Sequence, residues 1–460
     1  MRRRGADTRS RRFALALAAL LCASCAPVLH PVGTPGQTPA GGPANPPAAP
    51  ATPAETAGPP AHFDLHSEPM IDVGLAWDLD SASVRLVGDA GLALDRAGGA
   101  RVEATSKWER RVTVRLRSGH ADVEADDMPG VRIETGDTLV ANGSGTNPGE
   151  ARALWNESTW RGSFRIFLNP RGRLTIVDRL PLEAYLLGVV PGEIGGLDDK
   201  LVEAGRAQAI AARSYTLFYR GRRAAEGFDL YGTVEDQVYG PTERERPIAS
   251  KCVEATRGEL LLSEGQPIRA NYCSTCGGIS AEVWEAWPAP ALPYLVSHPD
   301  RGSSDWCASS PQYRWREQWS ATEFLDNLRK FAPAQSVALP PDGAGELLDV
   351  RVASRSRSGR VWRLEVATST GAVTIPAYSI RQVLRRGGNP GAILRSNLFK
   401  IGVRRDPATH RAVAVVATGA GSGHGVGLCQ TGALGMARSG ASAASILAHY
   451  YPTAALEKRY

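Results

Sequence analysis

The 460-residue chain has no apolar run of the roughly 20 residues that a membrane-spanning helix needs. It also has no internal repeat of fixed period, which argues against a solenoid or a propeller. Aromatic residues are modest in number, whereas glycine and proline are abundant. Because the length suffices for more than one domain of ordinary size, we expect a globular chain with several domains.

The sequence also lacks a large excess of positive charge outside its first residues. The formal net charge of +6 would by itself suggest a nucleic-acid partner. Residues 1–24, however, hold six arginines and one aspartate, so they carry five of the six net positive charges. The rest of the chain is close to neutral overall, and the sequence therefore predicts no nucleic-acid partner.

The basic leader, residues 1–24, has the pattern of an export signal. Its arginines precede the apolar run Phe13–Leu21, and small residues follow. Ala23-Ser24-Cys25 is typical of the end of a lipoprotein box, in which Cys25 becomes the acylated first residue. Cys22 departs from the aliphatic residue usual in such boxes, so cleavage without lipidation stays open. We expect a periplasmic or cell-envelope protein that contacts the membrane only through a lipid anchor.

Composition then divides the chain further. Residues 25–61 are mostly Pro, Ala, Gly and Thr, which cannot bury a core and predict an extended tether. Residues 62–160 contain short alternating runs that predict a mostly β region with a supporting role. The alternating runs, including two beyond residue 160, are Val73–Trp77, Ser83–Val87, Val112–Leu116, Val131–Thr135, Phe164–Leu168 and Leu174–Val177.

Helical and strand-like patterns follow each other irregularly after residue 160. Helical spacing recurs at 182–190, 200–222, 321–331, 379–386 and 441–450, and strand-like runs recur at 348–353, 361–366 and 412–417. This order lacks the regular βαβ alternation of a doubly wound fold. The sequence predicts the α+β class, with a mostly β N-terminal region followed by one mixed α+β domain at 161–455.

One carboxylate is prominent in the stretch Leu180–Tyr219. Helical spacing at 182–189 is expected to end at Pro191, so that Glu193 lies on a glycine-rich turn. The next helix presents a face of mostly small residues that allows close packing, with Gln208 and Tyr215 as its polar members. Taken alone, a single Glu on a turn is typical of a solvated surface residue or a helix cap.

The same stretch resembles the signature of the SpoIID/LytB family of peptidoglycan-cleaving proteins. Gly188-Val189-Val190, Glu193 and the run Ala207–Tyr215 occur in the family's order. Three later stretches also match, Asp236–Tyr239, Tyr272–Gly278 and Gly423–Ala433, so the resemblance covers roughly residues 160–455. It implies a sporulation-like catalytic domain with a glycan groove, and it leaves open whether the protein acts in division, sporulation or wall turnover.

The resemblance also implies the chemistry. Glu193 would act as the single acid/base of a lytic transglycosylase, because the C6 hydroxyl of N-acetylmuramic acid can attack its own anomeric carbon. No cofactor is required for this reaction. The expected partners are peptidoglycan glycan strands. The LytB side of the family includes proteins described as modulators of wall amidases. A non-catalytic glycan-binding enhancer of a wall amidase is therefore the alternative, in which the same groove binds glycan and stimulates the amidase.

Six more residues are expected in or beside the groove, each with a structural role as its alternative. Arg213 would otherwise pair with a carboxylate, Tyr215 would fill the core, and a lone His in a loop is more often structural. Glu183 and Glu203 are rival carboxylates that we expect to be ordinary surface charges. The six candidates are Gln208, Arg213, Tyr215, Gln237, His424 and Gln430.

The cysteines are the remaining candidates. Cys273 and Cys276 form a Cys-x-x-Cys where many members of the resembled family have His and Ser, and Cys307 is a third. The set fits a disulfide or part of a zinc site, with His298 or His424 as a fourth ligand. Export to an oxidising compartment favours the disulfide. Cys252 and Cys429 are further candidates for pairing, and spacing does not fix the connectivity.

The leader generates the first prediction. If Cys25 is acylated, Cys25→Ala should move the protein from the membrane fraction to a soluble exported fraction, measured by fractionation and immunoblotting. Export itself should persist, because the charged and apolar parts of the signal are unchanged. Continued membrane association of the variant would contradict the lipoprotein assignment.

Overall fold

The computed structural model describes residues 65–460, apart from 89, 107, 108, 146 and 148. The export signal at 1–24, Cys25 and the tether at 25–61 therefore lie outside the described residues. The described part contains both helices and many strands, so the predicted α+β class is confirmed. None of its helices is long and apolar enough to cross a membrane.

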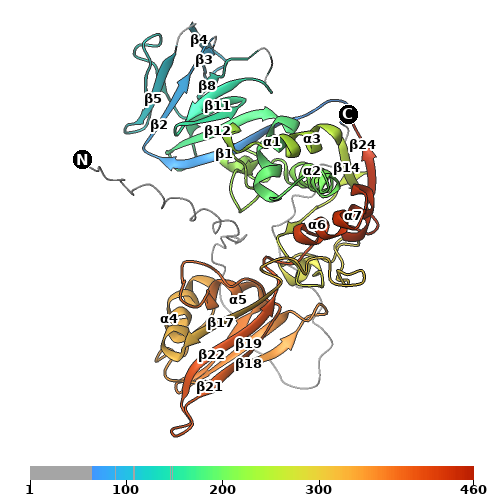
Figure 1. Cartoon of the computed structure of the whole chain (residues 1–460). Helices are drawn as coiled ribbons and strands as arrows, with labels where there is room; N and C mark the ends of the chain where they lie inside the picture. Colours follow the sequence, from blue (N-terminus) through green and yellow to red (C-terminus); the bar gives the residue numbers. More distant parts are fainter. Residues whose placement is uncertain (1–64, 89, 107–108, 146, 148) are drawn as a thin grey trace, which may run out of the picture.

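Two sheets form the N-terminal part of the molecule (Figure 1). Their order is β13-β1-β12-β11-β8-β3-β4 and β10-β9-β2-β5-β6-β7, largely antiparallel. The strands are β1 (Met70–Leu79), β2 (Ser81–Leu86), β3 (Ala90–Asp95), β4 (Arg101–Ser106), β5 (Arg110–Leu116), β6 (Ala121–Glu124), β7 (Arg132–Ile133), β8 (Thr138–Asn142), β9 (Arg152–Trp155), β10 (Ser158–Arg161), β11 (Ser163–Leu168), β12 (Leu174–Pro181) and β13 (Leu230–Tyr231).

Each alternating run of the sequence coincides at least in part with one of these strands, because a half-buried strand buries every second side chain. In β11, for example, Phe164, Ile166 and Leu168 are buried and their neighbours are not. The expected boundary near residue 160 nevertheless falls inside a sheet, since β11 and β12 pair with strands from before it. The strands and the helices that follow bury side chains in one continuous core.

The central helices are α1 (Leu182–Glu193), α2 (Val202–Tyr219) and α3 (Pro247–Ala255). The first begins directly after β12 and extends beyond its expected end at Pro191, so Glu193 is its last residue rather than part of a free turn. Proline in the last turn removes only one donor, and Ile194 N closes the helix on Val190 O at 3.0 Å. The small-residue face of α2 is buried against its neighbours, as expected.

A second core lies within the range that the sequence assigned to one domain. Buried residues between Trp315 and Ala417 form a hydrophobic cluster of their own, separate from the first. It is built from β17 (Arg314–Ser320), α4 (Ala321–Phe331), β18 (Leu347–Arg355), β19 (Val361–Thr368), β20 (Gly371–Pro376), α5 (Ala377–Leu384), β21 (Phe399–Arg405) and β22 (Ala412–Ala420). We call residues 314–420 the inserted module.

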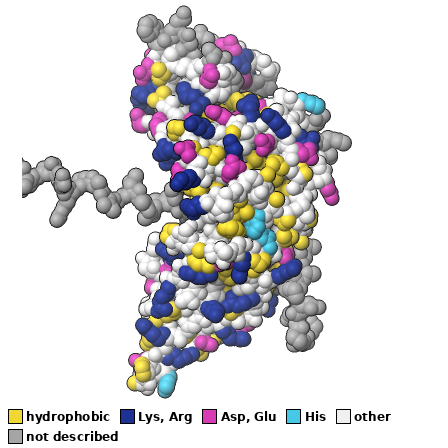
Figure 2. Space-filling view, turned by 45° about the vertical axis from the view of Figure 1, so that its right-hand side comes forward, with side chains coloured by type: hydrophobic (Ala, Val, Ile, Leu, Met, Phe, Trp, Pro, Cys, Tyr) yellow, Lys and Arg dark blue, Asp and Glu magenta, His cyan; other side chains and the backbone are white. Residues whose placement is uncertain are grey.

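The chain returns to the first core after the inserted module (Figure 1). This C-terminal part contains β23 (Leu428–Cys429), α6 (Gln430–Arg438), α7 (Ala443–Tyr450) and β24 (Ala455–Lys458). It pairs with β14 (Glu259–Ser263) and β16 (Tyr272–Cys273), which precede the module; β15 (Gln266–Pro267) continues the β14 sheet. On the face drawn in Figure 2, Asp and Glu lie mostly over the first core, and Lys and Arg predominate over the module.

A buried ion pair joins α1 to α2. The Arg213 guanidinium donates to both Glu183 oxygens, at 2.8 and 2.7 Å, and to the Glu259 carbonyl at 3.1 Å. The Tyr460 hydroxyl also donates to Glu183, at 2.6 Å. The expectation that Glu183 is a surface charge is therefore wrong, since it faces α2 and is 7% exposed. Arg213 is 0% exposed, a position that favours its structural alternative over contact with a ligand.

This pair generates the second prediction. Arg213→Met should lower the free energy of unfolding by about 3–5 kcal/mol, because it leaves the Glu183 carboxylate buried without its partner. Denaturant unfolding measures the change. Arg206→Met is the matched control on the same helix: its partly exposed pair with Glu203 should contribute only about 0–1 kcal/mol. Equal effects of the two substitutions would contradict the structural role of Arg213.

Candidate active site

Glu193 is held at the end of α1 by a neighbouring backbone segment. Its Oε1 accepts a hydrogen bond from Val238 N at 2.8 Å. Two glycines of α1 allow this segment to lie so close: a Cβ at Gly188 would be 2.5 Å from the Tyr239 ring, and one at Gly192 would be 3.0 Å from the Val238 carbonyl oxygen. The glycines of the motif thus bring the backbone donor to the carboxylate.

Tyr272 lies on the same carboxylate and is itself held by Gln237. Gln237 Nε2 donates to the Tyr272 hydroxyl at 2.9 Å, which leaves the hydroxyl proton free to bond Glu193. Gln237 Oε1 accepts from Thr216 and Tyr185, at 2.7 and 3.3 Å. Since Gln237 is fully buried and bonded at both ends, it orients Tyr272 rather than presenting a free amide to a ligand.

Two further amides reach the site from α2 and α6. Gln430, the first residue of α6, places Nε2 3.5 Å from both Glu193 Oε2 and Gln208 Oε1. Gln208 is fully buried, and its Nε2 has no acceptor among the described residues. The structure therefore brings Glu193, Gln208, Gln237 and Gln430 together from segments far apart in the sequence.

The surroundings of Glu193 shift its protonation. Burial raises its pKa to about 7, against the hydrogen bonds from Val238, Gln430 and Tyr272, which favour the charged form. Its place at the C-terminal end of α1, the negative end of the helix dipole, acts in the same direction as burial. Glu193 remains partly accessible to solvent. The arrangement therefore offers an outside group a carboxylic acid that is half protonated near neutral pH.

Tyr215 and His424 lie further from the carboxylate. Tyr215 is buried, with its ring 4.6 Å from that of Tyr219 and 6.1 Å from that of Tyr272. His424 packs on Trp287 at 4.7 Å and accepts Val426 N on Nδ1 at 3.0 Å. Burial, with Arg381 and Arg269 nearby, lowers the pKa of His424 to about 3, so its imidazole is neutral. Both residues border the site through Tyr272 rather than through Glu193.

The cysteines are arranged differently from the expected set. Cys276 and Cys307 do come together, with their sulfurs 3.7 Å apart, but Cys273 is not in the group. Cys429 and Asp300 complete it, and all four ligand atoms lie within 4.8 Å of one another. Neither proposed histidine is a member, since His424 packs on Trp287 and His298 packs on His449. None of the five described cysteines forms a disulfide.

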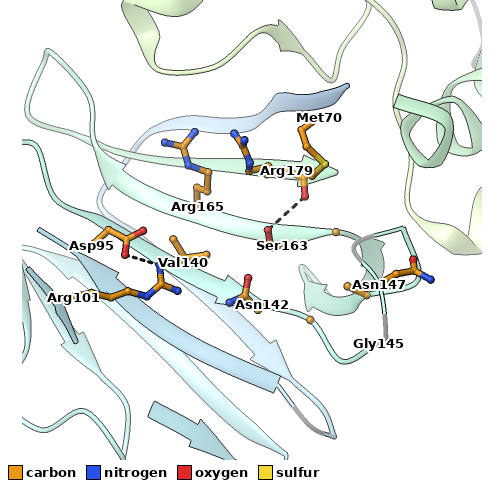
Figure 3. A pocket seen from close by; sticks show the side chains of 13 residues that line it. Met70, Asp95, Arg101, Val140, Asn142, Gly145, Asn147, Ser163, Arg165 and Arg179 are labelled. Atoms are coloured by element: carbon orange, nitrogen blue, oxygen red, sulfur yellow. Dashed lines mark hydrogen bonds and ion pairs between the residues drawn. The ribbon is translucent and has the colours of Figure 1, made fainter. Parts of the chain in front are cut away.

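A cavity of about 580 Å³ opens elsewhere, on the N-terminal sheets (Figure 3). Arg101, Arg165 and Arg179 line it, and Asp95 pairs with Arg101 across one side. No candidate residue of the Glu193 site lines this cavity. It is therefore a feature of the β region, separate from the Glu193 site and its chemistry.

Sequence reasoning missed several contributors. Tyr272 stands directly before the Cys-x-x-Cys motif on the short strand β16, and its place in the matching stretch Tyr272–Gly278 was the signal that could have identified it. Val238 contributes through its backbone N–H, which no side-chain pattern can reveal. Asp300 lies in a loop with no motif around it, and Cys429 was weighed only as a pairing partner.

Comparisons with known proteins show which sequences this chain is similar to. The family model described as "Stage II sporulation protein" matches residues 170–262, which include Glu193 and Gln237. A second model, described as a domain of unknown function, matches residues 303–427, nearly the inserted module.

Curated relatives match over a longer range. Stage II sporulation protein D of Bacillus amyloliquefaciens is 30% identical over 291 residues, which cover 60% of this chain and 74% of the relative. The protein of the same name from Bacillus subtilis is 29% identical with the same coverage. A Bacillus subtilis "Amidase enhancer" is 26% identical over 306 residues, 58% of this chain and 39% of the relative. From these matches and the arrangement around Glu193, the chain belongs to the SpoIID/LytB family.

Proposed function

We propose that this protein is an exported lytic transglycosylase that cleaves the glycan strand of peptidoglycan, with Glu193 as its single acid/base. The observation that carries the proposal is a partly accessible carboxylate at the end of α1 that three hydrogen-bond donors hold in place; its burial raises its pKa to about 7. Membership of the family supports a role at the cell wall. The lipid anchor on Cys25 and the tether would hold the enzyme within reach of its substrate.

In this reaction Glu193 gives up one proton and later receives another. Protonated Glu193 gives its proton to the glycosidic oxygen as the bond to C1 of N-acetylmuramic acid breaks. The C6 hydroxyl of the same sugar then bonds to C1, and its proton passes to the Glu193 carboxylate. The products are a 1,6-anhydro-muramic end and a free hydroxyl on the leaving sugar. No water is consumed, and Glu193 ends in the state in which it began.

The site's electrostatics suit a mechanism with one carboxylate. Glycoside hydrolases that use water place a second carboxylate roughly 5–9.5 Å from the first. Within the described part of the chain, no carboxylate is among the main causes of the Glu193 pKa shift. Glu183, on the same helix, is bound to Arg213. The donors from Val238, Tyr272 and Gln430 would stabilise the carboxylate that forms after the proton leaves.

A second reading follows from one relative. The name "Amidase enhancer" belongs to a protein that shares 26% of the aligned residues with this chain. On that reading the residues around Glu193 would bind glycan and stimulate a wall amidase without breaking a glycosidic bond. Products of the purified protein on isolated glycan strands separate the two readings.

The third prediction concerns Glu193 itself. Glu193→Gln keeps the size and one acceptor oxygen of the side chain but removes the acid. Because general acid–base catalysis contributes on the order of 100- to 10,000-fold, release of anhydro-muramic ends should fall by at least about 100-fold. Chromatography and mass spectrometry of digested glycan strands measure it. Binding of the strands should persist.

Glu203→Gln is the matched control for this experiment and should stay active, since Glu203 is partly exposed and contacts Arg206 and Ala443 N. Glu183→Gln is not a suitable control, because it removes charge from a buried ion pair. Cleavage by Glu193→Gln at the wild-type rate would contradict the mechanism. If the wild type releases no anhydro ends but stimulates a wall amidase, the enhancer reading replaces it.

The fourth prediction concerns pH. The reaction starts from protonated Glu193, so kcat/KM should be constant below about pH 6 and should fall as pH rises through about 7. Tyr272→Phe removes a hydrogen bond that favours the charged form, so the fall should move to higher pH. Tyr378→Phe is the control: this tyrosine donates to the Trp284 carbonyl at the inserted module and should leave the profile unchanged. A shift to lower pH in Tyr272→Phe would contradict the assignment.

A further inference from the structure

The cysteine cluster described above is a buried set of soft ligands with one carboxylate. Asp300, Cys307 and Cys429 are each 0% exposed, and Cys276 is 1% exposed. Thiolates select zinc among the common divalent metals, and structural zinc sites use four ligands in a tetrahedron. Two sulfurs on one tetrahedral zinc lie about 3.8 Å apart, given bonds of about 2.3 Å. The Cys276 and Cys307 sulfurs are 3.7 Å apart.

The surroundings prepare these atoms to be ligands. Backbone N–H groups of Cys276 and Gly432 donate to the Cys429 sulfur at 3.2 and 3.3 Å, and Gly278 N donates to the Cys276 sulfur at 3.3 Å. Cys429 also caps the N-terminus of α6, where the helix dipole favours a thiolate. Such donors stabilise negative sulfur, which is the form that a metal ligand takes.

Asp300 is oriented in the same way. Its Oδ1 accepts from the Tyr450 hydroxyl at 2.8 Å and lies 3.2 Å from His449 Nε2. These contacts leave Oδ2 directed to the cluster, 2.9 Å from the Cys276 sulfur. Outer hydrogen bonds of this kind hold the ligands of metal sites in place. Around a zinc ion, the contact between this oxygen and the sulfur would widen by about half an ångström.

The position of the cluster in the fold indicates a structural role at the base of the inserted module. Cys276, Asp300 and Cys307 precede the inserted module, and Cys429 follows it. The four ligands therefore connect the segment that enters the module to the segment that leaves it. β16 and β23 pair there, Tyr272 with Leu428 and Cys273 with Cys429. Tyr272 and Gln430, which both contact Glu193, are therefore close neighbours in sequence of two ligands.

We propose that Cys276, Asp300, Cys307 and Cys429 form a structural zinc site that fastens the base of the inserted module beside the Glu193 site. Binding replaces three thiol protons by one divalent ion, with no change of oxidation state. A disulfide would use two of the sulfurs and leave the third thiol and the Asp300 oxygen without a common partner. This inference concerns metal content and folding, and it stands independently of the catalytic proposal.

The fifth prediction is the metal content of the purified protein. Elemental analysis should find one zinc per chain, and thiol titration of the denatured protein should find Cys276, Cys307 and Cys429 reduced. Addition of Co²⁺ to chelator-treated wild type should give thiolate-to-metal charge-transfer absorption that saturates at one equivalent and is removed by Zn²⁺. Chelation should also lower the melting temperature, because metal binding is linked to folding.

Variants locate the site. Cys307→Ser and Cys429→Ser should lose the metal, whereas Cys252→Ser, in a buried cysteine beside Val202, should keep it. The wild-type cobalt titration decides the question even if the ligand variants fail to fold. A folded wild type that binds neither zinc nor cobalt, or a mass-mapped disulfide between two of the three cysteines, would overturn the proposal. Zinc retained equally by all folded variants would place the metal elsewhere and would overturn it as well.

Discussion

The packing of α1 against α2 through the Glu183–Arg213 pair is the constraint on which the rest of the site depends. The guanidinium binds both carboxylate oxygens and also the backbone carbonyls of Glu259 and Val253. One buried cation thus joins α1, α2, the end of α3 and the strand β14. Because a helix is stiff over this length, fixing the start of α1 also fixes its last residue, Glu193.

The two carboxylates of α1 have opposite surroundings, and this difference separates structure from chemistry. Glu183 has a cation and several donors, so its charge is compensated inside the protein. Glu193 accepts hydrogen bonds from the neutral donors Val238, Tyr272 and Gln430, and burial raises its pKa to about 7. The start of α1 therefore stabilises the packing of two helices through Arg213, whereas its last residue, Glu193, is a proton donor near neutral pH.

The inserted module contacts the first core through the loop between β18 and β19. In this loop, Arg360 donates hydrogen bonds to the backbone carbonyls of Cys276 and Ile279, each at 3.1 Å. Ser356 and Ser358 donate to buried Glu285. The module is thus attached close to the cysteine cluster, to β16, which carries Tyr272, and to α6, which begins at Gln430.

The sequence by itself determined the elements with strong periodicity and the motif around Glu193. Alternating runs identified β11 and β12, and helical spacing identified α2 and the whole of α4. The sequence motif alone identified the glycine-flanked carboxylate. Local patterns could do this because burial repeats every second residue in a strand and about every third or fourth in a helix.

Only the tertiary structure showed which residues from distant segments contact one another. Helical spacing could not show that Glu183 faces Arg213, because that contact joins two helices. The roles of Tyr272, Val238 and Asp300 depend on segments that meet only in the folded chain. The Cys-x-x-Cys motif suggested Cys273 as a ligand. In the structure Cys273 ends β16 and is not in the cluster, whereas Cys276 lies beyond that strand and is in the cluster. Cys429 joins the cluster from beyond the inserted module. Spacing along the chain fixes local direction, whereas a site built from distant segments is fixed by how their surfaces pack.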